Sequence, residues 1–167
     1  VSKRNGQWEP WTWTLVGEKT AQMATAFQKM GLKSGDKVAI FSDNCPEWII
    51  TDFACMASGL ISVPIYGTQT EEQARYIVEH SEAKAIVVRG EARLNKITSL
   101  SNLQKIINID GASGSGDSRV TSFESFLKDG HSDWKTLARD ASTLNLNQLA
   151  TIVYTSGTTA NPKGVML

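Results

Sequence analysis

The amino-acid sequence predicts an α/β fold made of βαβ units, in which a largely parallel sheet is flanked by helices. Short apolar runs typical of buried strands recur roughly every twenty residues, and segments with helical periodicity lie between them. Strands that alternate with helices form parallel sheets whose crossovers are right-handed. At 167 residues, the chain is long enough to bury one core.

An extended segment and a helix open the chain. Alternating tryptophans over residues 7–13 predict an extended segment whose rings pack at the edge of the fold. Apolar residues at helical spacing predict a helix from about Leu15 to Met30, with Thr14 as its N-terminal cap and Gly31 at its end. The turn that follows leads into a strand at residues 37–41.

A second helix is expected between residues 44 and 58. Asn44 would cap it, Pro46 would lie in its first turn, and Gly59 would end it. The apolar residues expected to form its buried stripe are Trp48, Ile49, Phe53, Met56 and Ala57. A short strand at residues 61–65 follows.

The third helix has the clearest start signal. Thr70 and Gln73 match a capping box, in which the threonine caps the helix and the glutamine reaches back to the backbone. Ala74, Ile77 and Val78 are its expected buried residues. The remaining expected segments are strands at 84–88, 105–109 and 149–153, helices at 91–100 and 122–127, a flexible loop at about 110–118 and a polar connection at 128–147.

The stretch from Tyr154 to Gly164 is the strongest functional signal in the chain. Its sequence, Y-T-S-G-T-T-A-N-P-K-G, combines hydroxyl side chains, glycines, a proline and one lysine directly after a strand. Glycines let a backbone approach an anion closely, hydroxyls donate hydrogen bonds, and a lysine amine is a point charge suited to phosphate. These residues predict a loop that holds a polyphosphate, although a Ser/Thr/Gly surface turn would have the same composition.

The order of these residues does not match a Walker A motif. That motif requires Ser or Thr directly after its lysine, whereas Gly164 follows Lys163 here. Residues 154–164 instead resemble the signature phosphate loop of the adenylate-forming (AMP-binding) superfamily, [YF]-T-S-G-[ST]-T-G-x-P-K-G. One residue departs from that pattern, since Ala160 stands where the family has glycine. If that position needs a left-handed backbone, alanine costs on the order of 1 kcal/mol and weakens nucleotide binding.

Two further segments resemble the same superfamily, and most closely its long-chain fatty acyl-CoA synthetases. They are G-D-K-V-A-I-F-S-D-N-C-P-E-W at residues 35–48 and the segment at residues 57–70 that contains V-P-I-Y. The resemblance implies that residues 1–167 are the N-terminal portion of the large AMP-binding domain, with its phosphate loop at 154–164. The rest of that domain and a smaller C-terminal domain would follow.

The resemblance also implies an activity, that of an acid-thiol ligase. A long-chain fatty acid would react with ATP and Mg²⁺ to give an acyl-adenylate and pyrophosphate, and coenzyme A would then displace AMP. This chemistry proceeds by positioning and charge neutralisation without a protein nucleophile. The piece alone is expected to be inactive, because the family's ribose-binding aspartate and the lysine of its C-terminal domain lie beyond this sequence.

Carried over by position, the family's roles fall on the loop. Lys163 would be the catalytic residue that assists departure of pyrophosphate, and Thr155 would also lie near Mg²⁺. The residues expected to contact the ATP phosphates are Thr155, Ser156, Gly157, Thr158, Thr159, Lys163 and Gly164. Asn161 and Pro162 would set the turn. Outside the loop, a helix start explains Asn44, Pro46 and Glu47, and packing is preferred over substrate access for Tyr66.

Composition excludes several other classes of function. Acidic and basic residues number 17 each, which gives no electrostatic case for a nucleic-acid partner. Cys45 and Cys55 match neither a C-x-x-C motif nor a disulfide framework and are expected to be reduced thiols. His80 and His131 are isolated, so no metal site made by the protein alone is expected.

The reduced thiols are consistent with an intracellular protein, and a cytoplasmic location is expected. The most apolar region, residues 48–66, is interrupted by polar residues and is not a membrane span. The resemblance leaves open a peripheral association with membranes and a homodimer. Two alternatives to the ligase also stay open at this point. One is an adenylating enzyme with another carboxylate or with a carrier-protein thiol as acceptor, and the other is a non-catalytic nucleotide-binding module.

Overall fold

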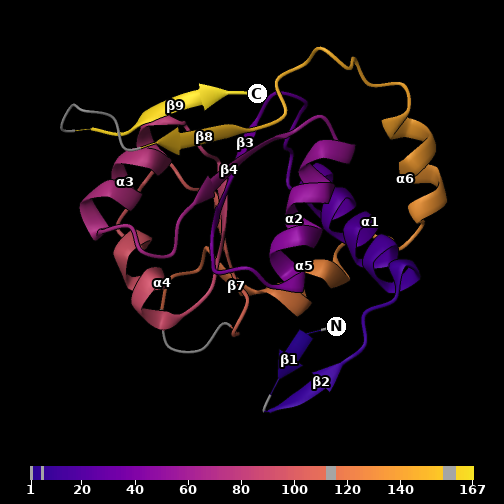
Figure 1. Cartoon of the computed structure of the whole chain (residues 1–167), viewed down its shortest axis with the longest axis horizontal. Helices are drawn as coiled ribbons and strands as arrows, with labels where there is room; N and C mark the ends of the chain where they lie inside the picture. The colour runs from indigo at the N-terminus through magenta and orange to yellow at the C-terminus, as the bar shows by residue number, and fades with distance from the viewer. Residues whose placement is uncertain (1, 5, 112–115, 156–160) are drawn as a thin grey trace.

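The computed structural model describes residues 2–4, 6–111, 116–155 and 161–167, and it confirms the predicted α/β architecture (Figure 1). Five parallel strands form the central sheet in the order β4-β3-β5-β6-β7. These strands are β3 (Lys37–Phe41), β4 (Ile61–Ile65), β5 (Ala85–Val88), β6 (Lys105–Asn108) and β7 (Val120–Ser122). Two antiparallel pairs lie outside this sheet, namely β1 (Ser2–Arg4) with β2 (Gln7–Glu9) and β8 (Ile152–Thr155) with β9 (Lys163–Met166).

Helices cover both faces of the central sheet (Figure 1). They are α1 (Trp13–Lys29), α2 (Pro46–Ala57), α3 (Glu71–His80), α4 (Glu91–Ile97), α5 (Phe123–Lys128) and α6 (Trp134–Ala141). One face is covered by α3 and α4, and the other by α1, α2 and α5, with α6 outermost against α1 and α2. This arrangement follows from the alternation of strands and helices along the chain.

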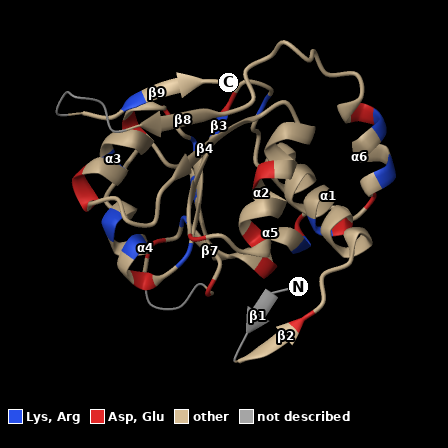
Figure 2. Cartoon of the chain, viewed as in Figure 1, with Lys and Arg blue, Asp and Glu red and all other residues tan. Residues whose placement is uncertain are grey.

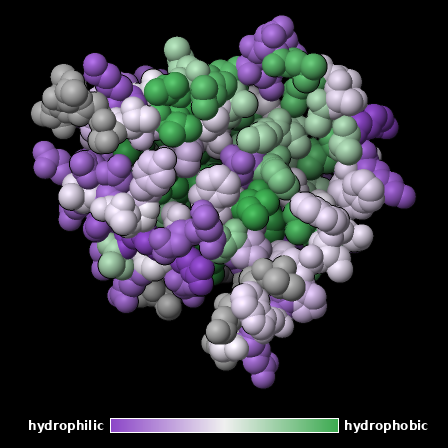
Figure 3. All heavy atoms as spheres, viewed as in Figure 1, coloured by the Kyte–Doolittle hydropathy of each residue, from purple (hydrophilic) through white to green (hydrophobic). Residues whose placement is uncertain are grey.

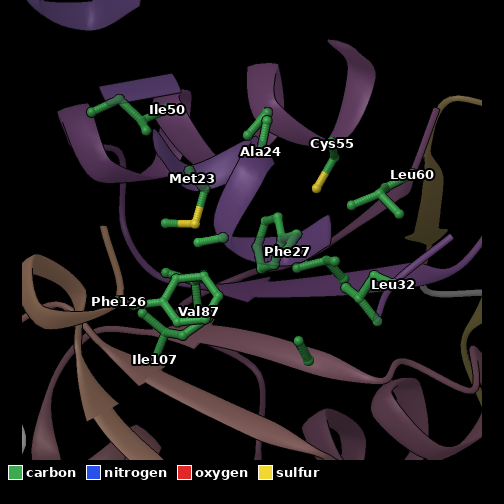
Figure 4. Packing of buried hydrophobic residues seen from close by; sticks show 14 of the residues in the cluster. Met23, Ala24, Phe27, Leu32, Ile50, Cys55, Leu60, Val87, Ile107 and Phe126 are labelled. Carbon is green, nitrogen blue, oxygen red and sulfur yellow. The ribbon is translucent and has the colours of Figure 1, made fainter. Parts of the chain in front are cut away.

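Alternate residues of the strands enter two separate hydrophobic clusters. Val87 of β5 belongs to the cluster under α1, α2 and α5, whereas its neighbours Ile86 and Val88 belong to the cluster under α3 and α4. Figure 4 shows the first cluster, in which Phe27 of α1 lies near Phe126 of α5 with ring centroids 5.4 Å apart. Continuous apolar runs such as A-I-V-V are therefore explained by strands buried on both faces.

The prediction for α3 is confirmed, including its capping box. Gln73 N–H donates to the Thr70 hydroxyl over 3.2 Å, and Thr70 N–H donates to the Gln73 side-chain oxygen over 3.1 Å. Ala74, Ile77 and Val78 are its buried residues. For α1, the predicted cap is wrong by two positions, because Thr12 has an extended backbone and accepts from Leu15 N–H over 3.1 Å.

For α2, the predicted cap and buried stripe are both wrong. Cys45, not Asn44, occupies the cap position, and no side chain caps the helix there. The residues that are buried are Glu47, Ile50, Thr51, Ala54 and Cys55. Ile49, Phe53 and Met56 are 44%, 40% and 42% exposed, and Trp48 and Ala57 are partly buried. Small side chains at Ala54 and Cys55 allow α2 to lie close to its neighbours on the face opposite to the predicted one.

Other predicted bounds differ where the pattern is short. The strand expected at 149–153 is β8, which begins at Ile152, and α4 ends at Ile97. β7 was missed, and α6 lies within the segment expected to be a polar connection. Part of the expected flexible loop, residues 112–115, falls outside the described residues.

Both cysteines are free, as expected from the sequence. Burial raises the pKa of the Cys55 thiol, so this side chain stays protonated and is a poor nucleophile. Among the described residues, no helix combines the length and the apolar character that crossing a bilayer requires.

Candidate functional site

The predicted phosphate loop joins the two strands of the β8–β9 hairpin. The pairing places Tyr154 opposite Gly164 and Thr155 opposite Lys163. Lys163 and Gly164, which the sequence assigns to the loop, are thus the first residues of β9. Ser156, Gly157, Thr158 and Thr159 lie outside the described residues, so their predicted phosphate contacts stay predictions. Ala160 lies outside them too, and its expected effect on nucleotide binding also stays a prediction.

Thr155 and Lys163 form the last described pair before the loop. Residues directly opposite each other in an antiparallel pair share a face, with Cβ atoms about 4.5–5.5 Å apart. Both residues are exposed, and no ion pair within the described part of the chain involves Lys163. A hydroxyl and a free ammonium therefore stand side by side where the chain enters and leaves the loop.

The position of the hairpin relates the loop to the central sheet. Thr151, just before β8, pairs in parallel with Ser62 of β4, and its hydroxyl donates to the Ser62 carbonyl oxygen over 3.0 Å. Because β8 starts out parallel to β4, its carboxyl end runs toward the edge where the strands of the sheet end. Ligands of open α/β sheets bind at this edge.

Tyr154 is the buried residue of the hairpin stem, at 3% exposure. Its hydroxyl lies 2.7 Å from Nδ1 of His80, the last residue of α3. A Cβ atom on Gly164 would lie 2.8 Å from Ile152 Cγ2 and 3.2 Å from Tyr154 Cζ, so only glycine fits beside this ring without displacement. Pro162 is also buried, which restricts the backbone just before Lys163.

A hollow at the carboxyl edge of the sheet was not predicted. In the central sheet, β3 comes first in the chain, with β4 on one side of it and β5 on the other. This is a doubly wound strand order, and the ligand crevice expected from it lies where β3 and β5 end. A cavity of about 480 Å³ opens next to it, at the ends of β3 and β4. Its lining residues include Asp43, Asn44, Trp48, Tyr66 and Gly67.

An arginine–carboxylate pair closes the β3/β5 end of this hollow. Nη2 of Arg93 lies 2.9 Å from each oxygen of Asp43, and its Nη1 donates to the Arg89 carbonyl oxygen over 3.1 Å. The guanidinium also lies 5.7 Å from the centroid of the Phe41 ring. Arg93 therefore holds the loops after β3 and β5 together, and its charge is already balanced.

Tyr66 and Gly67 complete the same region. Tyr66 is 61% exposed and lines the hollow, so the structure does not support the preference for packing over substrate access. A Cβ on Gly67 would lie 2.4 Å from Asp43 Oδ1 and 2.5 Å from Arg93 Nη2, so this glycine makes room for the ion pair. Asp43 and Gly67 each lie two residues after a strand, and both fall within the family-like segments at residues 35–48 and 57–70.

A metal site made by the protein alone is absent from the described residues, which contain no group of three or more His, Cys, Asp or Glu side chains suited to a metal. Mg²⁺ commonly binds through a few protein oxygens together with substrate phosphates. The exposed Thr155 hydroxyl beside the loop fits that kind of site.

A second hollow lies away from the hairpin, between α1, α2 and α6. It measures about 420 Å³ and is lined mainly by apolar side chains. Its largest lining residues are Trp13, Phe53, Met56, Trp134 and Leu137. On the face shown in Figure 3, hydrophobic residues gather over α2, which forms one wall of this groove. A separate group of hydrophobic residues lies along β8 and β9. Among the described residues, none that lines this groove is charged, so the groove offers no cation to a phosphate.

Comparison with known proteins places the hairpin in context. The sequence model of the family described as AMP-binding enzyme matches residues 1–167. Long-chain-fatty-acid–CoA ligase FadD15 of Mycobacterium bovis is 31% identical over 167 residues, which cover 98% of this chain and 27% of that protein. Long-chain-fatty-acid–CoA ligase ACSBG2 of Xenopus laevis is 32% identical over 172 residues, covering 100% of this chain and 23% of that protein.

A solved structure confirms the fold. The N-terminal domain of FACL13 from Mycobacterium tuberculosis, with an inhibitor bound, superposes with a TM-score of 0.75 at 21% identity. The superposition covers 93% of this chain and 37% of the other. The chain spans about a quarter of the length of the curated relatives it matches.

Proposed function

This chain belongs to the AMP-binding enzyme family over its whole length, and from that premise we propose that it supplies the phosphate-binding part of an ATP-dependent ligase for long-chain fatty acids. In this proposal, residues 1–167 are the N-terminal portion of the enzyme's large domain. The β8–β9 hairpin carries the proposal, because Thr155 and Lys163 stand exposed and adjacent at the two ends of the T-S-G-T-T-A-N-P-K-G segment.

The proposed reaction has two steps. A carboxylate oxygen of the fatty acid attacks the α-phosphorus of ATP, and the bond to the bridging oxygen breaks so that pyrophosphate leaves with the electron pair. The thiol of coenzyme A then loses its proton and attacks the acyl carbon, and AMP leaves. Acyl-CoA, AMP and pyrophosphate are the products. The names of the relatives support the choice of a long-chain fatty acid and coenzyme A as substrates.

The role of the loop in this reaction is to bind and neutralise phosphate charge. The Lys163 ammonium would lie against the pyrophosphate portion, where negative charge grows as the bond breaks. Thr155, Ser156, Gly157, Thr158, Thr159 and Gly164 would line the β- and γ-phosphates with hydroxyl and backbone donors. A magnesium ion bound with ATP would neutralise further charge on the phosphates, and Thr155 is the protein hydroxyl proposed to lie near it.

The decisive experiment is ATP–pyrophosphate exchange by the full-length protein that contains this chain. Carboxylates from acetate through palmitate to benzoate and amino acids would be compared. We expect exchange to be fastest with long fatty acids. If only another carboxylate supports exchange, the proposed substrate class is wrong and that carboxylate takes its place. If a folded protein shows exchange with none of them, the proposal is contradicted.

A variant tests the role given to Lys163. Lys163→Ala should lower the exchange rate about 100-fold, in line with the loss of a preorganised charge at a leaving group. Lys135→Ala is the matched control, because Lys135 lies on α6 beside Trp134 and away from the hairpin. Equal rates for Lys163→Ala and the control would contradict the role.

A further inference from the structure

We propose that His80 is a positioning residue that holds the phosphate-binding hairpin in place through Tyr154. The inference deepens the proposed function and rests on it, because it assigns a task to a residue outside the loop. His80 belongs to α3, and Tyr154 belongs to β8, 74 residues later in the chain. Their contact therefore ties the hairpin to a helix that packs on the central sheet.

The hydrogen bond between these residues is short and well shielded on one side. The Tyr154 hydroxyl lies 2.7 Å from His80 Nδ1, and Tyr154 is 3% exposed. Burial raises the pKa of the Tyr154 phenol, so it keeps its proton at neutral pH. The bond forms with either tautomer of His80, since the phenol can donate to a bare Nδ1 or accept from a protonated one.

Aromatic contacts hold the His80 ring from two sides. Its ring stacks on Tyr76 with centroids 5.1 Å apart and an interplanar angle of 27°. The Tyr154 ring meets it edge to face, at 5.7 Å and 87°. Edge-to-face and offset-stacked pairs are the favoured arrangements of such rings. The imidazole is thus fixed in orientation as well as in hydrogen bonding.

The position of Tyr154 sets the position of both strands of the stem. Its ring lies beside Gly164, its partner in the ladder, where a side chain would clash with it. The next pair along the ladder is Thr155 with Lys163. A strand advances about 3.3 Å per residue. Tyr154 and Gly164 are therefore immediately adjacent to Thr155 and Lys163, the two exposed residues proposed to bind phosphate.

The helix that carries His80 is itself well anchored. Its start is closed by the Thr70–Gln73 capping box. Its buried face, Ala74, Ile77 and Val78, packs in the cluster that also contains Tyr154. A loop that must bind a flexible polyphosphate gains affinity when it is held in its bound position beforehand. His80 and Tyr76 supply such a hold from outside the loop.

Four single variants of the full-length enzyme, together with the double variant Tyr154→Phe/His80→Phe, test the contact between His80 and Tyr154. Tyr154→Phe removes the hydroxyl, and His80→Phe keeps an aromatic ring but removes Nδ1. His80→Asn replaces Nδ1 by an amide oxygen at a similar position. His131→Asn is the control, because His131 is exposed and is distant in sequence from both His80 and Tyr154. Amide hydrogen exchange and steady-state kinetics would be measured for each.

We expect Tyr154→Phe and His80→Phe each to lower kcat/KM for ATP about tenfold, a typical effect of losing one hydrogen bond together with its positioning. The KM for the fatty acid at saturating ATP should stay within about twofold. The double variant should be no worse than either single one, because both remove the same bond. His80→Asn should recover most of the loss, and His131→Asn should resemble the wild type.

Amide exchange reports on the brace without any turnover. Residues 152–155 and 163–166 should exchange faster in Tyr154→Phe and His80→Phe, while α1 stays unchanged. Additive losses in the double variant, a parallel rise in the fatty-acid KM, or unchanged hairpin exchange would each overturn the inference. If the wild type shows no ATP-dependent exchange of pyrophosphate, the proposed function fails, whereas an active wild type with an unaffected His80→Phe variant removes only the brace.

Discussion

The helices α2 and α3 both follow a strand of the central sheet, yet they meet solvent in different ways. α3 is one-sided, because it buries Ala74, Ile77 and Val78 and exposes acidic residues. α2 buries one face and still exposes Ile49, Phe53 and Met56 on the other. Figure 2 shows charged residues on α3 and α4, while the visible side of α2 is mostly uncharged.

The difference explains why the sequence predicted one helix correctly and the other wrongly. An apolar stripe identifies the buried face of a helix only when the opposite face is polar. In α2 two of the five buried residues, Glu47 and Thr51, are polar, whereas large apolar residues lie on the exposed side, so the apolar stripe did not mark the buried face. Its outward residues Phe53 and Met56 line the apolar groove with Trp13 and Trp134, which gives that second face neighbours of its own.

The largest expected effects come from removing side chains on the buried faces. Ile50→Ala in α2 and Ile77→Ala in α3 should each lower the free energy of unfolding by about 2–5 kcal/mol, since both side chains are fully enclosed. Ile49→Ala, one position along α2, should cost clearly less because its side chain is 44% exposed. Urea unfolding measures all three, and equal losses for Ile49→Ala and Ile50→Ala would break the comparison.

The caps of the two helices give the next largest contrast. Thr70→Ala should lower the free energy of unfolding by about 1 kcal/mol, because it removes half of the capping box. Cys45→Ala should cost less than Thr70→Ala, since Cys45 makes no capping hydrogen bond. Urea midpoints for the two variants test this, and a larger loss for Cys45→Ala would show that packing at this position outweighs capping.

A smaller effect is expected from Asp52 on α2. Burial raises the pKa of this carboxyl above its ordinary 3.8. Because the pKa of Asp52 is higher in the folded state, ionisation of its carboxyl lowers the free energy of unfolding. This loss of stability is absent at low pH, where the carboxyl is protonated in both states, and is complete once the pH exceeds the folded-state pKa. Asp52→Asn should therefore stabilise the protein at pH 7, with the gain vanishing below about pH 3.5. A gain that grows on acidification would contradict the assigned pKa direction.

The smallest effect is expected on the outward face of α2. Met56→Gln should change the free energy of unfolding by about 0.5 kcal/mol or less, as exposed substitutions usually do. Met56 is 42% exposed and lines the open groove between α1, α2 and α6. The same substitution at a buried position of similar size, Met23→Gln, is the contrast and should be severely destabilising. Comparable losses for the two variants would mean that the outward face is as tightly packed as the core.

Much of the architecture could be predicted because local signals agree with the fold. The bounds of β3 and β4 match the predicted strands, since each is a short apolar run between turn residues. α6 was missed although Trp134, Leu137 and Ala138 recur at helical spacing, and in the structure Trp134 lies against Gly17 of α1. The helix is eight residues long and buries none of them fully, so its clear periodicity was overlooked within a segment that is polar as a whole.

The candidate site was predictable only where it is continuous in sequence. The order of residues in 154–164 indicated the loop, and the structure places Thr155 and Lys163 side by side at its ends. The pairs that surround it join distant segments, since Arg93 bonds to Asp43 across 50 residues and Tyr154 to His80 across 74. Such contacts depend on the sheet order and leave no local pattern.

The attachment of β8 beside β4 has a consequence for the order of folding. Thr151 and Ser62 are 89 residues apart, whereas β3 and β4 are joined by a single helix. Closing a longer loop costs more chain entropy, and non-local pairing slows folding. The hairpin that presents Thr155 and Lys163 is therefore expected to dock after the β3–β4 pair has formed, so the proposed phosphate site would stay incomplete until that late step.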